Sequence, residues 1–161
     1  MAIEIERKYL VKNDTWRAGA KGRRMVQGYL SRDPHRTVRV RISGEQAWMT
    51  VKGPTTGMSR EEVEFPLDLG LAQELLGMSL DEPIDKTRYD ISFAGMLWEV
   101  DEFHGANAGL IVAEIELPHE DHAFEKPDWL GEEVTSERRY SNSKLSKRPW
   151  STWKDEEKNP S

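Results

Sequence analysis

The sequence predicts a mainly β (α+β) protein in which about eight antiparallel strands close into a β-barrel around a charged cavity. First, short segments alternate apolar with charged residues at a period of two, which is typical of strands with one apolar and one polar face. Second, short turn sequences such as Ser43-Gly44-Glu45 separate successive segments, so neighbouring strands are expected to pair antiparallel. Third, the expected strands number about eight, and a barrel of about eight strands can enclose a cavity that holds one small ligand.

Each expected element follows from its local pattern. The expected strands cover residues 3–11, 25–30, 38–42, 49–52, 62–65, 84–91, 96–103 and 110–117. An Asp cap, apolar residues at helical spacing and a closing Gly predict a helix over residues 68–77. Short helices are expected at residues 129–130 and 140–145. We therefore expect one domain over residues 1–146 and a polar, Pro-containing, disordered tail over residues 147–161.

Composition excludes several classes of protein. Charged residues make up 32% of the 161 residues, above the ~25% of typical domains, so the excess charge needs a location. A net charge of −6 argues against a basic surface for nucleic acid, and the absence of Cys excludes disulfides and thiolate sites. No segment approaches the ~18 apolar residues of a transmembrane helix, and the acidic N-terminal segment is unlike a signal peptide. We therefore expect a cytoplasmic protein without a membrane or nucleic-acid partner.

Charged residues of like sign recur two positions apart, on one face of a strand. The pairs are Glu4/Glu6, Arg39/Arg41, Glu62/Glu64, Lys86/Arg88 and Glu114/Glu116. One interpretation is that these are the ordinary solvated faces of antiparallel strands. However, like charges on one face repel unless opposite charges compensate them, so separate acidic and basic pairs favour a cavity for a divalent cation and a polyanion. Carboxylates without Cys favour Mg²⁺ or Mn²⁺, and Arg and Lys suit phosphate oxygens.

The charged pairs belong to an ordered series of motifs. Glu4-Ile5-Glu6-Arg7-Lys8 matches an ExExK motif, and it is followed by Arg39-x-Arg41, Thr50-Val51-Lys52-Gly53, Glu62-x-Glu64, Lys86-x-Arg88, Val100-Asp101-x-Phe103, Glu114-x-Glu116, Val134-Thr135 and Arg139-Tyr140-Ser141-Asn142. Over residues 3 to about 146 this series resembles the CYTH domain, also called the triphosphate tunnel metalloenzyme superfamily. The resemblance implies an eight-stranded antiparallel tunnel with a hydrophilic interior that binds a triphosphate and one or more divalent metals.

The resemblance also implies a role for each charged set. The implied substrate-binding residues are Lys8, Arg39, Arg41, Lys52, Lys86 and Arg88. The implied metal-binding residues are Glu4, Glu6, Glu62, Glu64, Asp101, Glu114 and Glu116. For catalysis, we expect a second metal or a carboxylate such as Glu6 or Glu64 to orient the attacking water, and Lys8 to act on that water or on the terminal phosphate. A basic side chain on a helix that plugs one tunnel mouth would be Arg139 or Lys144.

Among the activities of this family, the resemblance favours that of short bacterial members, which hydrolyse inorganic triphosphate to pyrophosphate and phosphate. The alternatives are a thiamine triphosphatase, a nucleoside triphosphatase, a class IV adenylate cyclase, and a polyphosphate- or nucleotide-binding module without turnover. Trp48 shares a face with Lys52 and would either stack an organic group or be an ordinary strand Trp, and Tyr29 would be structural or a hydrogen-bonding group in the tunnel. His119 and His122 are expected at the surface, and a homodimer is compatible with the sequence.

Overall fold

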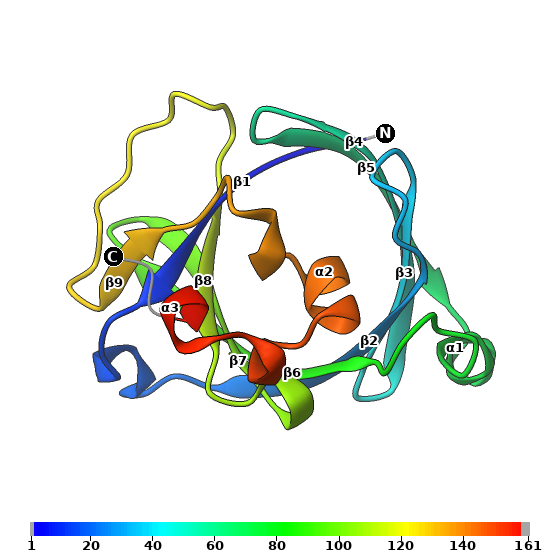
Figure 1. Ribbon diagram of the computed structural model, residues 1–161. Coiled ribbons are helices and arrows are strands. Elements are labelled where there is room, and N and C mark those ends of the chain that lie inside the picture. Colours follow the sequence, from blue (N-terminus) through cyan, green and yellow to red (C-terminus); the bar gives the residue numbers. More distant parts are fainter. Residues whose placement is uncertain (1, 159–161) are drawn as a thin grey trace.

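In the described part of the chain, nine antiparallel strands form one sheet, and this sheet closes into a barrel (Figure 1). The structure, a computed structural model, describes residues 2–158. The strands are β1 (Ala2–Val11), β2 (Gly22–Ser31), β3 (Thr37–Ser43), β4 (Gln46–Thr56), β5 (Ser59–Leu67), β6 (Ile84–Phe93), β7 (Met96–Phe103), β8 (Ile111–Glu116) and β9 (Leu130–Glu133). Their order is β5-β4-β3-β2-β6-β7-β8-β1-β9, and a further pairing of β5 with β1 closes the ring. The strands β1 to β8 thus form the closed antiparallel barrel that the sequence predicts, and β9 is added at the edge of β1.

β1 closes the barrel because its neighbours change along its length. One edge of its C-terminal half pairs with β8. The other edge pairs with β5 over residues 2–5, and with β9 near Val11. The short helix predicted at residues 129–130 is wrong, because Leu130 pairs with Val11 and belongs to β9. Residues 129–130 are too few to show a helical or a strand period in the sequence. Leu130 joins a strand because β5 leaves this edge of β1 free beyond residue 5.

Short helices connect the strands and cover parts of the barrel. They are η1 (Thr15–Arg17), α1 (Leu69–Leu76), η2 (Gly105–Asn107), η3 (Arg138–Tyr140), α2 (Asn142–Lys147), η4 (Trp150–Thr152) and α3 (Asp155–Lys158). α1 matches the helix predicted over residues 68–77, and Asp68 caps it by accepting a hydrogen bond from the backbone nitrogen of Leu71 at 3.2 Å. Within residues 2–158, no helix is both long and apolar enough to cross a membrane.

The apolar strand faces point away from the barrel interior, and other segments cover much of them, although Val63 and Phe65 on the outward face of β5 stay exposed. Trp98 of β7 is fully buried, and its ring lies 5.7 Å from the rings of both Tyr9 and Trp129. On another side of the barrel α1 lies outside β3, where its Ala72 packs against Val40 (Figure 1). Because the outward faces carry the hydrophobic core, the inward faces are free to carry charge.

The C-terminal helices plug one end of the barrel. On the inward faces of β6, β7 and β8, the charged positions give way to Ile84, Phe103 and Val112 at one end of the strands. These side chains form a cluster with Leu145 of α2 and with Trp153. Figure 1 shows α2 inside the ring of strands. The plug therefore lies against an apolar end of an otherwise charged interior.

The structure differs from the sequence in the expected disordered tail. Within the described part of that tail, Trp153 is only 4% exposed, and its ring lies 5.1 Å from the ring of Tyr140. Its Nε1 donates to the backbone oxygen of Arg148 at 3.1 Å. The polar composition suggests disorder, but a single buried Trp supplies enough apolar area to hold a short segment against the plug. Residues 159–161 of the expected tail lie outside the described residues.

Candidate active site

The barrel encloses a cavity of about 430 Å³ whose wall is mainly charged. Each of the strands β1 to β8 contributes at least one side chain to this wall. All of the predicted site residues except Asp101 line it, namely Glu4, Glu6, Lys8, Arg39, Arg41, Lys52, Glu62, Glu64, Lys86, Arg88, Glu114 and Glu116. The interpretation of the charged faces as ordinary solvated strand surfaces is therefore wrong, because the barrel turns these faces inward.

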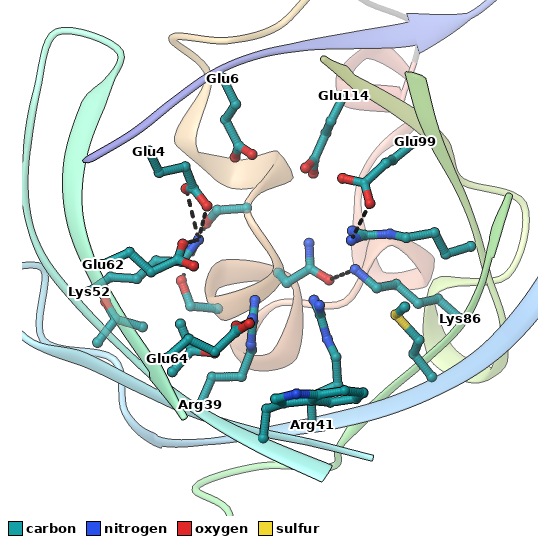
Figure 2. A pocket seen from close by; sticks show the side chains of 18 of the residues that line it. Glu4, Glu6, Arg39, Arg41, Lys52, Glu62, Glu64, Lys86, Glu99 and Glu114 are labelled. Atoms are coloured by element: carbon teal, nitrogen blue, oxygen red, sulfur yellow. Dashed lines mark hydrogen bonds and ion pairs between the residues drawn. The ribbon is translucent and has the colours of Figure 1, made fainter. Parts of the chain in front are cut away.

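Strand order separates the charges into an acidic wall and a basic wall. β8 and β1 are adjacent, and in their register Glu6 lies opposite Glu116. On the far side, β2 and its neighbours β3 and β6 carry the basic side chains, among them Arg41 and Lys86. Figure 2 shows Glu6 and Glu114 facing Arg41 and Lys86 across the cavity. A guest with both positive and negative parts can satisfy both walls at once.

Glu6 is a carboxylate of the acidic wall whose pKa is strongly raised. Burial, together with the nearby carboxylates of Glu114 and Glu4, raises its pKa to about 8. Among residues 2–158, Glu6 has no hydrogen-bond or ion-pair partner. Burial also raises the pKa values of Glu4 and Glu116. Such crowding of like charges is relieved by a cation.

The donor set of the acidic wall fits a divalent metal. It consists of carboxylate oxygens, the ligands that Mg²⁺ and Mn²⁺ prefer. Within the described residues, no three carboxylate or imidazole groups are already close enough to cage an ion by themselves. Mg²⁺ usually keeps several waters and shares its coordination between one or two carboxylates and substrate phosphates, so a preformed cage is not required.

Ion pairs connect the acidic and the basic sets. Lys52 Nζ donates to Glu4 Oε1 at 2.9 Å and Oε2 at 3.1 Å, and it lies 3.7 Å from Glu62 Oε2. Lys8 Nζ lies 3.7 Å from Glu114 Oε1. A metal that binds the carboxylates would therefore free the paired lysines for a polyanion. A polyanion that binds the lysines would in turn free the carboxylates for a metal.

Asp101 has a different place from the one expected of a metal ligand. It is 1% exposed, and its oxygens accept hydrogen bonds from Lys86 Nζ at 2.7 Å, Arg88 Nε at 2.8 Å and Arg88 Nη2 at 2.9 Å. Burial by itself would raise the pKa of Asp101, but Arg88 and Lys86 hold it well below its ordinary value. The metal-side role does not fit this geometry, because both carboxylate oxygens already hold the two cations in place. The sequence pattern could not separate a metal ligand from a counter-charge on the same face.

Some residues that line the cavity or contact its charged side chains were not among the predicted site residues. Glu99 lies opposite Glu114 in the register of β7 and β8, and its carboxylate accepts a hydrogen bond from Arg88 Nη1 at 3.2 Å. Its position two residues before Asp101 was the signal that could have found it. Gln27 and Asn142 are two others, and as neutral amides they carry no charge pattern that points to them.

A second chamber of about 260 Å³ continues the tunnel toward the plug. It shares Lys8 and Arg60 with the main cavity, and Lys144 of α2 also lines it. Arg139 lines neither chamber, because its guanidinium packs 4.8 Å from the ring of Trp153 and pairs with a carboxylate of the same turn. Of the two candidate basic residues of the plug, the structure therefore places Lys144 at the tunnel.

Trp48 and Tyr29 lie at the cavity, whereas His119 and His122 do not. Trp48 and Tyr29 both line the main cavity, and Trp48 lies opposite Arg41 in the register of β3 and β4. His119 is exposed and His122 is half-buried, and their rings contact each other at 5.2 Å away from the cavity wall.

The fold and the site define a class of protein: a β-barrel tunnel with opposed acidic and basic walls, which is suited to a cation together with a polyanion. The chain belongs to the CYTH domain family, whose model matches residues 2–149.

Two relatives of known name support this placement. The chain is 47% identical to an inorganic triphosphatase of Acetivibrio thermocellus over 156 residues, which cover 96% of this chain and 100% of the relative. It is 36% identical to an inorganic triphosphatase of Nitrosomonas europaea over 148 residues, which cover 89% of this chain and 96% of the relative. A crystal structure of an inorganic triphosphatase superimposes with a TM-score of 0.66 at 33% identity, covering 88% of this chain and 96% of that chain.

Proposed function

We propose that this protein is a divalent-metal-dependent inorganic triphosphatase, which hydrolyses tripolyphosphate to pyrophosphate and phosphate inside the barrel. The observation that carries this proposal is the pair of opposed charged walls around a single cavity of about 430 Å³. A substrate that is charged along its whole length suits a cavity whose wall is mainly charged. The names of the two relatives support the same substrate.

The basic wall binds the phosphates. Its side chains on β3 and β6 are Arg39, Arg41, Lys86 and Arg88, and two further cations beside the acidic wall, Lys8 of β1 and Lys52 of β4, would join them. Arg presents paired donors that match phosphate oxygens, and Lys adds point charges. Burial lowers the pKa of Lys86 to about 7, and the neighbouring cations Arg88 and Arg41 lower it as well. A bound polyanion removes this mutual repulsion, so the wall is built for a guest of high negative charge.

The acidic wall is suited to hold the metal, which we propose to be Mg²⁺, with Mn²⁺ as the alternative. The residues that would hold it are Glu4, Glu6, Glu62, Glu64, Glu114 and Glu116. When bound, the metal neutralises charge on the phosphate oxygens and favours attack by water. Phosphoryl transfer needs little else from a protein than positioning and charge stabilisation, so the proposal requires no covalent nucleophile.

Glu6 is better suited than Glu64 to orient the attacking water. The carboxylate of Glu64 already accepts a hydrogen bond from Thr50 Oγ1 at 2.6 Å and lies 3.4 Å from Arg39 Nη2. Glu6 has no such partner among the described residues, so its side chain is free to make a hydrogen bond with the attacking water. Lys8 lies where the two chambers meet, beside the terminal phosphate in this proposal.

Trp48 favours a second candidate function, the hydrolysis of an organic triphosphate. Its indole lines the cavity beside Arg41, where it would stack a thiazolium or a nucleobase. A class IV adenylate cyclase, or a binding module without turnover, would use the same charged walls. The cytoplasmic location, the homodimer and the absence of a nucleic-acid partner stay predictions from the sequence.

Phosphate release from tripolyphosphate, ATP and thiamine triphosphate, each with Mg²⁺ and with EDTA, tests these functions. The proposal predicts the highest kcat/KM for tripolyphosphate and no turnover in EDTA. Preference for ATP or thiamine triphosphate would favour the organic substrate. If tripolyphosphate raised the melting temperature without being turned over, the protein would be a binding module.

A further inference from the structure

Asn142 lies at the cavity wall, and its side-chain oxygen is engaged by two donors. Its Oδ1 accepts a hydrogen bond from Lys86 Nζ at 2.9 Å and another from Gln27 Nε2 at 3.1 Å. An ammonium group has donors only, so the amide oxygen of Asn142 must be the atom that faces Lys86. The amide nitrogen of Asn142 therefore faces away from Lys86.

Gln27 fixes the same orientation independently. It is fully buried, and its Oε1 accepts a hydrogen bond from Arg41 Nε at 2.8 Å. A guanidinium also has donors only, so the oxygen of Gln27 faces Arg41, and its nitrogen faces Asn142 Oδ1 and the hydroxyl of Tyr29, the latter at 3.2 Å. Two cations, one at each end of the amide pair, thus impose the same arrangement.

The side-chain nitrogen Nδ2 of Asn142 takes no part in this network. Asn142 lines the main cavity, and within residues 2–158 its Nδ2 has no hydrogen-bond partner. Helix capping does not account for the residue either, because the cap of α2 is Ser141, whose hydroxyl accepts from the backbone nitrogen of Lys144. The network holds a neutral N–H donor at the cavity wall without using it.

We propose that Asn142 is a substrate-binding residue, which donates a hydrogen bond from Nδ2 to a phosphate oxygen of the bound triphosphate. This proposal rests on the proposed function. A neutral donor has an advantage at this place, because Lys86, Arg41 and Arg88 already crowd the basic wall and another cation would add to their repulsion. The amide adds binding energy from a hydrogen bond to a charged oxygen without adding charge.

Two substitutions isolate the N–H donor. Asn142→Asp keeps an oxygen acceptor for Lys86 and Gln27 but replaces the donor with a carboxylate oxygen. Asn142→Ala adds no charge but removes the acceptor, and Ala is well tolerated inside a helix. Loss of the donor is the one change that both variants share. Asn13→Asp is the matched control, since Asn13 is exposed and Oδ1 keeps its bonds from Thr15 N at 3.0 Å and Thr15 Oγ1 at 2.6 Å.

The measurements are kcat and KM for tripolyphosphate with Mg²⁺, and the rise in melting temperature on adding tripolyphosphate in EDTA. Loss of a hydrogen bond to a charged group predicts a fall in kcat/KM of roughly 10- to 100-fold in both Asn142 variants. It also predicts a smaller rise in melting temperature on adding tripolyphosphate. Asn13→Asp is expected to match the wild type in both measurements. The melting temperature of Asn142→Asp without ligand should equal or exceed that of the wild type, because its carboxylate pairs with Lys86.

The outcomes separate this proposal from the proposed function. If the wild type hydrolyses tripolyphosphate and either Asn142 variant keeps wild-type kcat/KM, the Asn142 proposal is overturned and the triphosphatase stands. A loss in Asn142→Asp alone would show an effect of charge, and a loss in Asn142→Ala alone would show misplacement of Lys86. If the wild type neither hydrolyses tripolyphosphate nor is stabilised by it, both proposals fall together.

Discussion

Replacing Asp101 with Asn is expected to destabilise the protein strongly even when no metal is present. The carboxylate accepts three hydrogen bonds from Lys86 and Arg88, and all three residues are buried. In either orientation, the Asn amide would point an N–H group at one of these cationic donors. Breaking a buried ion pair by removing one partner costs about 3–5 kcal/mol.

The corresponding assay is thermal unfolding in EDTA, followed by circular dichroism. At about 2–4 °C per kcal/mol for a chain of this size, the melting temperature should fall by roughly 6–20 °C. Glu99→Gln is the matched control, because the Glu99 side chain is 31% exposed and holds Arg88 through one bond of 3.2 Å. Partly exposed pairs contribute about 0–1 kcal/mol, so this control should lose only a few degrees.

The pH dependence of the Asp101→Asn effect has a definite sign. The folded-state pKa of Asp101 lies below its ordinary value, so its contribution to the free energy of unfolding is complete above the unfolded pKa and is lost as pH falls toward the folded one. The difference in melting temperature between wild type and variant should therefore persist at neutral pH and shrink below about pH 4. An unchanged melting temperature in EDTA, together with weaker metal binding, would refute the reasoning and return Asp101 to the metal ligands.

Further predictions concern the acidic wall and the plug. Glu116→Ala is expected to abolish Mg²⁺-dependent turnover of tripolyphosphate while the fold stays intact, and wild-type activity would contradict the metal assignment. The pKa of Glu6 is raised to about 8, so the stability that its protonated form contributes is present at low pH and is lost as pH rises toward 8. The free energy of unfolding of the metal-free protein should therefore fall over this pH range. Glu6→Gln should remove this pH dependence. Lys52→Met frees Glu4 from its ion pair, so calorimetry should show tighter Mn²⁺ binding and weaker tripolyphosphate binding; unchanged Mn²⁺ affinity would argue against competition between Lys52 and the metal. Trp153→Ala should lower the free energy of unfolding by about 3–5 kcal/mol, and a loss near zero in chemical denaturation would show that the tail does not support the plug.

Much of the fold could be predicted because it depends on local geometry. In a strand, successive side chains point to opposite sides, so Glu4, Glu6 and Lys8 share a face wherever the strand lies. The same rule places Arg39 with Arg41. Since apolar residues occupy the other face, burial of that face decides the direction of the charged one, and it points into the barrel.

Residues whose roles depend on distant neighbours could not be assigned in this way. The pattern groups Asp101 with the acidic set, but the register of β6 and β7 places it opposite Arg88 and makes it a counter-charge. Leu130 becomes part of a strand because β1 has a free edge near Val11. Trp153 is ordered because an apolar end of the barrel lies within its reach.

The sequence by itself determined which residues are charged, which of them share a strand face, and hence that a mixed acidic and basic site is present. Only the tertiary structure decided that β1 lies between β5 and β8, which brings Glu4, Glu6, Glu114 and Glu116 together and leaves Arg41 and Lys86 facing them across the cavity. It also decided the orientation of the Asn142 amide, because Asn142 contacts Lys86, which lies 56 positions earlier in the chain, and Gln27, which lies 115 positions earlier. The physical reason is that the alternation of side chains is a property of each strand alone, whereas wall, counter-charge and amide orientation depend on which strands closure of the barrel brings together.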